Sequence, residues 1–221
     1  MSLRVPVVTT RRAATLASIG RHKVSAIIRA ADREKAERAM EAAVAGGFRV
    51  VEFTLTTPGA LDLVREFSKR PGLVVGAGTV LDTRVAKDAV AAGAEFLVSP
   101  VTDPEIIREA QALDVVCIPG VFTPTEMLLA HRSGAELLKI FPAPADLPAF
   151  ITQVRGPFPE LKLFPTAGVT QENIEGILKA GAFGAGFVAS LFRPDDIAAG
   201  NFDAIESRAK AIVEKIRPLL D

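Results

Sequence analysis

Residues 32–54, DREKAERAMEAAVAGGFRVVEFT, contain one complete unit of the pattern that decides the fold of this chain. Between 32 and 45, small or apolar residues recur at three- and four-residue spacing with charged residues between them, which is typical of an amphipathic helix. Gly46 and Gly47 then supply the usual helix stop. The run that follows is rich in Val and Phe, as in a buried strand. The unit is therefore helix, glycine turn, strand.

The same unit recurs along the chain, with small-residue stops at 92–94, 133–135 and 180–182. Alternating strands and helices require parallel strands joined by crossover helices, and eight units in 221 residues predict a (β/α)8 TIM barrel. An open doubly wound sheet is the alternative, but no G-x-G-x-x-G fingerprint follows the first strand. Strands are expected near 24–29, 48–53, 73–77, 95–99, 115–118, 136–141, 161–164 and 184–188, and helices near 32–45, 58–69, 82–92, 103–112, 123–132, 147–154, 170–179 and 203–217.

We expect one domain over 1–221, with an N-terminal extension (1–23) ahead of the barrel (24–217). The extension is basic and has no acidic residue before Asp32. A targeting peptide is one interpretation of such a start. The interpretation that we favour is a short helix at Thr15–His22 ahead of the first strand.

Charge and cysteine content limit the possible partners. The 26 basic residues are balanced by 26 acidic ones, which argues against nucleic-acid binding. Cys117 is the single cysteine, so no internal disulfide can form, and a reducing cytoplasm is expected. No apolar run has the roughly 18–20 residues of a membrane helix.

Three charged residues lie in the C-terminal halves of predicted strands, where barrels of this kind carry their active sites. They are Arg29, Glu52 and Lys139, the last within Leu-Leu-Lys-Ile-Phe. Desolvation and a nearby cation such as Arg29 would lower the pKa of Lys139, so that its amine could attack a carbonyl and form a Schiff base. Glu52 would then move protons. The alternative is a buried Lys139–Glu52 ion pair that only plugs the barrel.

Other strand ends offer uncharged groups. The run 76–79, Gly-Ala-Gly-Thr, would allow a close backbone approach and present a hydroxyl, although it can also be an ordinary turn. The loops at 166–169 and 184–190 hold the usual phosphate position of such barrels. Glu95 and Glu136 begin their strands and are expected to cap the opposite end of the barrel. His22 and His131 have no His or Cys near them in sequence, so neither a metal nor a cofactor is predicted.

The residues, in this order, resemble the 2-dehydro-3-deoxy-phosphogluconate (KDPG) / 4-hydroxy-2-oxoglutarate (KHG) aldolase family. The resemblance extends from Val24 to Ile216. The motifs that carry it are Val51-Glu52-Phe53-Thr54, Gly76-Ala77-Gly78-Thr79-Val80, Val98-Ser99-Pro100, Ile118-Pro119-Gly120-Val121 and Leu138-Lys139-Ile140-Phe141-Pro142.

The resemblance implies a class I aldolase, usually a homotrimer, that cleaves or forms 2-keto-3-deoxy acids. The reaction it implies above all is cleavage of 2-dehydro-3-deoxy-6-phosphogluconate to pyruvate and glyceraldehyde 3-phosphate. Lys139 would be the Schiff-base lysine and Glu52 the general acid and base. Arg29 and Thr79 would hold the pyruvyl group between Pro100 and Phe141. The remaining substrate-binding residues would be Thr54, Gly78, Thr166, Gly168 and Ser190.

The chain departs from the family pattern where the far end of the substrate would bind. Thr56 stands where many members have Arg, and Ala167 stands in place of a Gly. The usual Gly-Ser of the eighth loop reads Val188-Ala189, with Ser190 one place later. Alternative activities are therefore KHG aldolase, an aldolase for an unphosphorylated or galactonate-type acid, or oxaloacetate decarboxylase. A phosphosugar isomerase and a non-catalytic ligand-binding barrel are the alternatives outside this class. The aldehyde partner and the C4 stereochemistry stay open.

Overall fold

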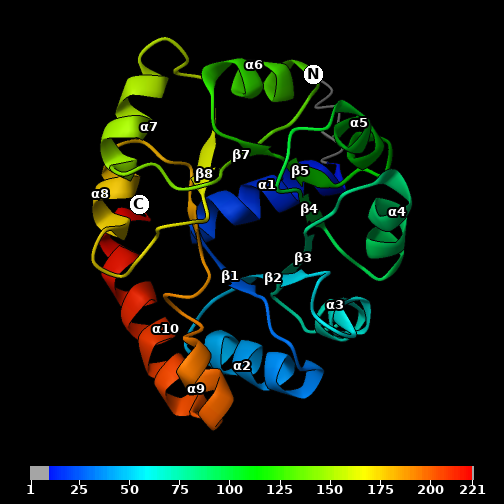
Figure 1. Ribbon diagram of the computed structural model, residues 1–221, viewed down its shortest axis with the longest axis vertical. Helices are drawn as coiled ribbons and strands as arrows, with labels where there is room; N and C mark the ends of the chain where they lie inside the picture. The colour runs from blue at the N-terminus through cyan, green and yellow to red at the C-terminus, as the bar shows by residue number, and fades with distance from the viewer. Residues whose placement is uncertain (1–9, 221) are drawn as a thin grey trace, which may run out of the picture.

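The computed structural model of the protein describes residues 10–220. Strands at the centre are surrounded by helices (Figure 1). The strands are β1 (Val24–Ile28), β2 (Val50–Thr54), β3 (Val74–Gly78), β4 (Phe96–Val98), β5 (Val116–Ile118), β6 (Gly120–Val121), β7 (Leu138–Ile140), β8 (Leu163–Pro165) and β9 (Ala185–Phe187). The helices are α1 (Arg11–His22), α2 (Arg33–Ala45), α3 (Ala60–Phe67), α4 (Thr83–Ala91), α5 (Pro104–Ala112), α6 (Pro124–Arg132), α7 (Leu147–Arg155), α8 (Ile174–Lys179), α9 (Pro194–Ala199) and α10 (Phe202–Ile216), followed by the 3-10 turn η1 (Arg217–Leu219).

All strand pairs are parallel, which confirms the predicted α/β fold with crossover helices. The strands form a curled six-stranded sheet in the order β5-β4-β3-β2-β1-β9 and a three-stranded sheet in the order β6-β7-β8. Residues 10–220 therefore do not form the one continuous eight-stranded ladder of a closed TIM barrel. Pro119 separates β5 from β6 because it has no N–H to donate to a ladder. Between β8 and β9, Phe183 N–H donates to the Leu163 carbonyl (2.9 Å).

The helices begin where the sequence supplies a capping side chain. Six of the described helices follow a residue whose side-chain oxygen accepts a backbone N–H of the first turn, which satisfies one of the donors that a helix start leaves free. These residues are Thr10, Asp32, Asp82, Asp103, Thr123 and Asp146.

Helix α1 crosses the N-terminal ends of the strands and passes across the ring in Figure 1. Ile19 is 1% exposed and packs among the first residues of several strands. The Thr15 hydroxyl donates to Glu95 (3.3 Å), and Arg12 pairs with Glu136 (2.9 Å). The helix begins at Arg11, earlier than the predicted Thr15. The first nine residues of the predicted extension, including Arg4, lie outside the described part of the chain.

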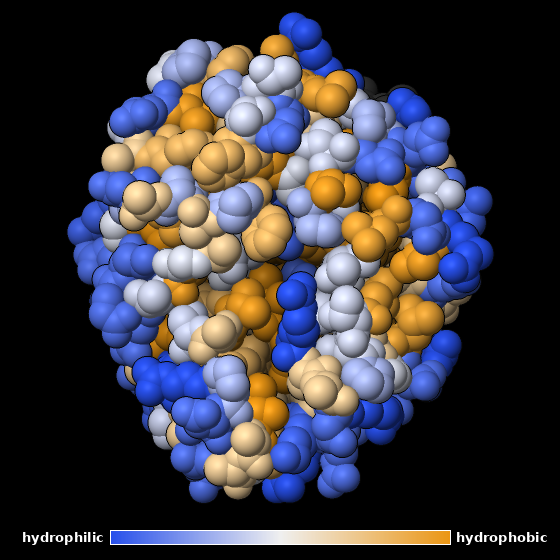
Figure 2. Space-filling view, in the orientation of Figure 1, coloured by the Kyte–Doolittle hydropathy of each residue, from blue (hydrophilic) through white to orange (hydrophobic). Residues whose placement is uncertain are grey.

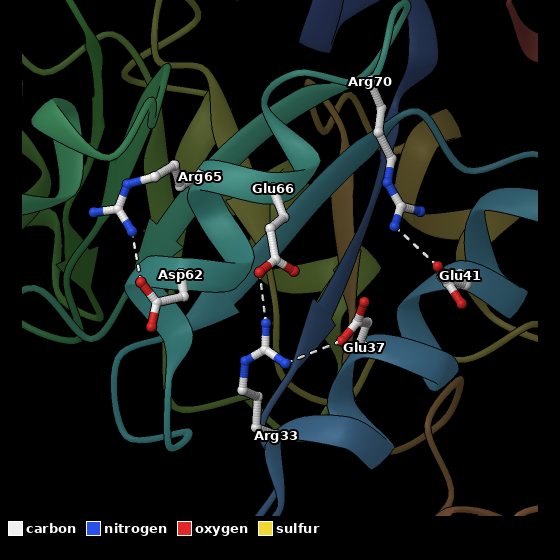
Figure 3. A network of polar contacts seen from close by, with 7 residues as sticks. All are labelled: Arg33, Glu37, Glu41, Asp62, Arg65, Glu66 and Arg70. Carbon is white, nitrogen blue, oxygen red and sulfur yellow. Dashed lines mark hydrogen bonds and ion pairs between the residues drawn. The ribbon is translucent and has the colours of Figure 1, made fainter.

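Neighbouring helices are joined by packing and by ion pairs. Gly46, after α2, has no space for a Cβ because it lies against Ala209 and the backbone of α10, so the first and last parts of the ring pack closely. Between α2 and α3, Arg33 pairs with Glu66 (2.6 Å) and with Glu37 of its own helix (3.3 Å) (Figure 3). No helix within residues 10–220 has the length and apolar character needed to cross a membrane.

Candidate active site

A cavity of about 400 Å³ lies at the C-terminal ends of the strands. Side chains from β1, β2 and β7 reach it, together with Thr79 directly after β3 and the loops that follow β8 and β9. Nine of the eleven residues predicted for the site line it: Arg29, Glu52, Thr54, Thr79, Lys139, Phe141, Thr166, Gly168 and Ser190. The fold therefore brings together side chains that are separated by more than 150 positions in the sequence.

Lys139 reaches this cavity from the short strand β7. Leu138 and Ile140 on either side are buried in the core, so the strand is fixed and the half-buried lysine faces the cavity. Its Nζ lies 4.9 Å from the centroid of the Phe141 ring. Burial lowers the pKa of Lys139 from its ordinary value; the Glu52 carboxyl opposes this shift and the Arg29 guanidinium adds to it.

Glu52 is only 3% exposed on strand β2. Burial raises the pKa of its carboxyl to about 7, although the positive charges of Lys139 and Arg29 favour the ionised form. Within residues 10–220, Glu52 and Lys139 form no direct ion pair, although they face the same cavity. Gly78 does not line the cavity, but a Cβ there would collide with Glu52 Oε1. Glycine at this position makes room for the carboxyl.

Thr79 lines the cavity in an unusual backbone conformation. Its φ is +62°, in the left-handed region that a β-branched residue rarely adopts. Strain of this kind costs on the order of 1–3 kcal/mol and persists only where the surrounding structure enforces it. The turn after β3 thus holds the Thr79 side chain at the cavity wall.

The loops after β8 and β9 are tied together on the side of the cavity away from β3. The Ser190 hydroxyl donates to the Val169 carbonyl (2.6 Å). Asn173 Nδ2 donates to the Gly168 carbonyl (2.7 Å), and its Oδ1 accepts Thr170 N–H (2.8 Å). The Ser190 hydroxyl hydrogen is thus already engaged by a carbonyl oxygen.

Some residues lie elsewhere than sequence reasoning placed them. Pro100 is outside the cavity lining, with its carbonyl against Gly120. Ile27 and Thr170 line the cavity and were not predicted, because an apolar strand residue or a loop residue gives no sign of which way it points. Within the described residues, no group of three His, Cys, Asp or Glu side chains is close enough to hold a metal ion.

A lysine and a carboxyl face one cavity at this end of a parallel α/β fold, which is the arrangement of a class I aldolase, an enzyme of the aldehyde-lyase class. The model of the family described as KDPG and KHG aldolase matches residues 17–208. The chain belongs to this family, as its motifs predicted.

Known relatives agree with this assignment. The chain is 42% identical over 144 residues to 2-dehydro-3-deoxy-phosphogluconate aldolase of Pseudomonas aeruginosa, a match that covers 62% of this chain and 64% of that enzyme. It is 36% identical over 172 residues to a probable 2-dehydro-3-deoxy-6-phosphogalactonate aldolase of Rhizobium meliloti, covering 76% and 81%.

Solved structures agree as well. KDPG aldolase from Legionella pneumophila, with pyruvate captured as a covalent carbinolamine intermediate, superimposes with a TM-score of 0.77 at 28% identity. That match covers 90% of this chain and 97% of the Legionella chain.

Proposed function

We propose that this aldolase cleaves 2-dehydro-3-deoxy-6-phosphogluconate to pyruvate and glyceraldehyde 3-phosphate through an imine at Lys139. The observation that carries the proposal is the pair formed by Lys139 and Glu52 in one cavity. Burial raises the pKa of the Glu52 carboxyl to about 7, so this group can exchange protons near neutral pH. Burial also lowers the pKa of the Lys139 amine, which favours its neutral, nucleophilic form. The covalent pyruvate adduct of the Legionella relative supports the same chemistry here.

The proposed reaction needs one nucleophile and one proton carrier. The neutral Lys139 amine attacks the C2 carbonyl, and a proton passes from the nitrogen to the oxygen to give the carbinolamine. Glu52 then protonates the leaving hydroxyl, so that water departs and a protonated imine remains. Glu52, now a carboxylate, accepts the proton of the C4 hydroxyl as the C3–C4 bond breaks; the bonding electrons pass to the imine, leaving an enamine and an aldehyde. Protonation at C3 and hydrolysis of the imine release pyruvate. Arg29 and Thr79 hold the pyruvyl carboxylate.

A substrate without a phosphate, or of the galactonate type, is the second candidate. The loops after β8 and β9 would receive the far end of the substrate, but Ala167 and Val188 place side chains where unobstructed backbone N–H groups would serve a phosphate best. The Ser190 hydroxyl is bonded to Val169. The name of the Rhizobium relative also supports a galactonate-type acid.

The imine is tested by reduction with borohydride in the presence of pyruvate, followed by peptide mass analysis. We expect one pyruvate-derived mass, on Lys139. Lys139→Arg should give no adduct and no turnover, because a guanidinium stays protonated and is not a nucleophile. Lys162→Arg, at the other end of the fold beside Phe183, is the matched control and should react like the parent. A label on another lysine, or none, would exclude the mechanism.

We also propose that the two sheets act as one (β/α)8 barrel, in a single domain, and that three copies assemble as a homotrimer in the cytoplasm. Large apolar side chains are exposed after β3, β4 and β6 and on α6: Leu81, Val101, Phe122 and Leu129. Figure 2 shows apolar side chains gathered on this face between the ends of β3 to β5 and α4. Exposed apolar patches of this kind are typical of protein interfaces. The free, buried Cys117 is in keeping with a reducing compartment.

A further inference from the structure

A second and much smaller chamber lies among the strands beneath the active-site cavity. Its volume is about 10 Å³, room for a single water molecule. Glu52 and Thr166 line both spaces, so the chamber adjoins the carboxyl at the floor of the cavity. Apart from Ser25, its other walls are apolar.

Ser25 faces this chamber from β1 and is 1% exposed. It pairs in register with Val50 of β2, two residues before Glu52, so Ser25 and Glu52 share the inner face of adjacent strands. Among the buried side chains of residues 10–220, Ser25 Oγ is the one polar atom without a hydrogen-bond partner. Leaving a buried hydroxyl unpaired is unfavourable, so a partner is expected.

The Glu52 carboxyl borders the same chamber and also faces the active-site cavity. No protein group within residues 10–220 donates a hydrogen bond to it, and its charged neighbours, Lys139 on β7 and Arg29 after β1, face it from the active-site cavity. On the chamber side Glu52 is the only ionisable group in the described lining. Two under-satisfied polar groups, Ser25 and Glu52, therefore border one space of the size of a water molecule, with Thr166 beside them.

We propose that Ser25 is a positioning residue for Glu52 and acts on it through one water held in this chamber. A hydroxyl and a water each donate and accept hydrogen bonds. The Ser25 hydroxyl and the water can together donate a hydrogen bond to the ionised Glu52 carboxylate. They can accept one from the protonated carboxyl, and neither case requires the strands to move. The role of the Ser25 hydroxyl and the water in turnover rests on the function proposed above. The existence of the water site does not rest on it.

The hydroxyl has a measurable consequence for Glu52. A hydrogen bond donated to a carboxylate stabilises the charged form. Removing the Ser25 hydroxyl leaves the water with fewer partners in a largely apolar chamber, so the ionised form of Glu52 loses support and its pKa rises. The sequence carries a signal for this residue: a single serine in the otherwise apolar strand Val24–Ile28.

The first experiment is a ¹³C NMR titration of the Glu52 carboxyl carbon in the protein without substrate, with the resonance assigned by its loss in Glu52→Gln. Ser25→Ala should move the midpoint upward by about one pH unit. Ser25→Gly removes the same hydroxyl without adding an atom to the chamber and should titrate like Ser25→Ala. A shift below about 0.2 units in Ser25→Ala would overturn the proposal.

The second experiment separates this proposal from the proposed function. The pH profile of kcat/KM is recorded for the parent, Ser25→Ala and Glu52→Gln. The limb that disappears in Glu52→Gln should move in Ser25→Ala by the same amount as the NMR midpoint, with KM changed less than about threefold. A limb that stays in place while the NMR midpoint moves would overturn the role in turnover. Near-normal turnover of Glu52→Gln would instead refute the proton-transfer role of Glu52, and the titration would still decide whether Ser25 supports the carboxyl.

Discussion

Glu52 carries an energetic cost that depends on pH. Its carboxyl has a pKa of about 7 in the folded protein against an ordinary value of 4.5. The folded state therefore holds this proton more tightly than the unfolded state does. The contribution of the protonated carboxyl to the free energy of unfolding is fully present below about pH 4.5. It is lost as the pH rises through 7, and the total change is about 3 kcal/mol.

Glu52→Gln removes this titration and keeps the volume. We expect Gln to stabilise the fold relative to Glu, with a difference that grows by up to about 3 kcal/mol between pH 4.5 and pH 8. Urea unfolding of both proteins at the two pH values measures it. The same substitution should lower turnover by roughly 10²–10⁴-fold, because a general acid and base is lost. A stability difference independent of pH would mean that Glu52 titrates normally in the folded protein.

At the scale of single elements, the position of α1 predicts that its apolar contacts contribute more to folding stability than its ion pair does. Ile19 is buried among the strand starts, so Ile19→Ala should cost about 2–4 kcal/mol through the cavity it leaves. Arg12→Ala breaks only the partly exposed pair with Glu136 and should cost less than about 1 kcal/mol. Chemical denaturation compares the two variants. A larger loss for Arg12→Ala would mean that charge rather than apolar packing holds the helix.

The loops after β8 and β9 make a prediction about substrate preference. If the side chains of Val188 and Ala189 obstruct the phosphate cradle, Val188→Gly with Ala189→Ser should raise the preference for a phosphorylated substrate by one to three orders of magnitude in kcat/KM. The gain corresponds to one or two charge-assisted hydrogen bonds of about 1.5–3 kcal/mol each.

The measurement is the ratio of kcat/KM for a phosphorylated 2-keto-3-deoxy acid and its unphosphorylated analogue. Ser190→Ala serves as the control. The Ser190 hydroxyl donates to the Val169 carbonyl, so its removal should change this ratio little. A parent enzyme that already prefers the phosphorylated acid by more than about a thousandfold would show that the cradle is intact.

The spacing of apolar residues and the glycine-containing stops predicted most helices and strands to within a few residues, because each unit repeats the same helix, glycine turn and strand. The elements that these patterns missed or misplaced each have a local cause. Helix α9 is only six residues long and buries none of them, so no apolar face marks it. Helix α1 starts early because Thr10 caps it ahead of the apolar spacing. The expected strand at 115–118 stops before Pro119, and a further two-residue strand follows that proline.

For the site, the sequence was most informative about charge. A lysine or glutamate inside an apolar strand stands out, and both reach the cavity. Distances between strands are not visible in a sequence, so it could not be foreseen that Lys139 and Glu52 form no ion pair within residues 10–220. Nor could the position of Pro100, since the last residue of a motif can turn either way at a strand end.

At the scale of the whole molecule, the exposed apolar side chains predict how copies assemble. Val101→Asp and Phe122→Asp place charges in the proposed interface and should convert a trimer to a monomer, as measured by light scattering. Leu220→Asp changes an apolar side chain of similar exposure near the C-terminus and should leave the trimer intact. A parent protein that scatters as a monomer would refute the homotrimer.

Helix α1 also bears on the order in which the proposed products leave. Within residues 10–220 it covers the N-terminal ends of the strands, and the cavity lies at their C-terminal ends, so substrate and products are expected to pass on that side. In the proposed reaction the pyruvyl half stays covalently attached to Lys139 at the floor while the aldehyde is free to leave. The aldehyde is therefore the first product out. In the direction of synthesis pyruvate must be first in, and an aldehyde that arrives early blocks its path.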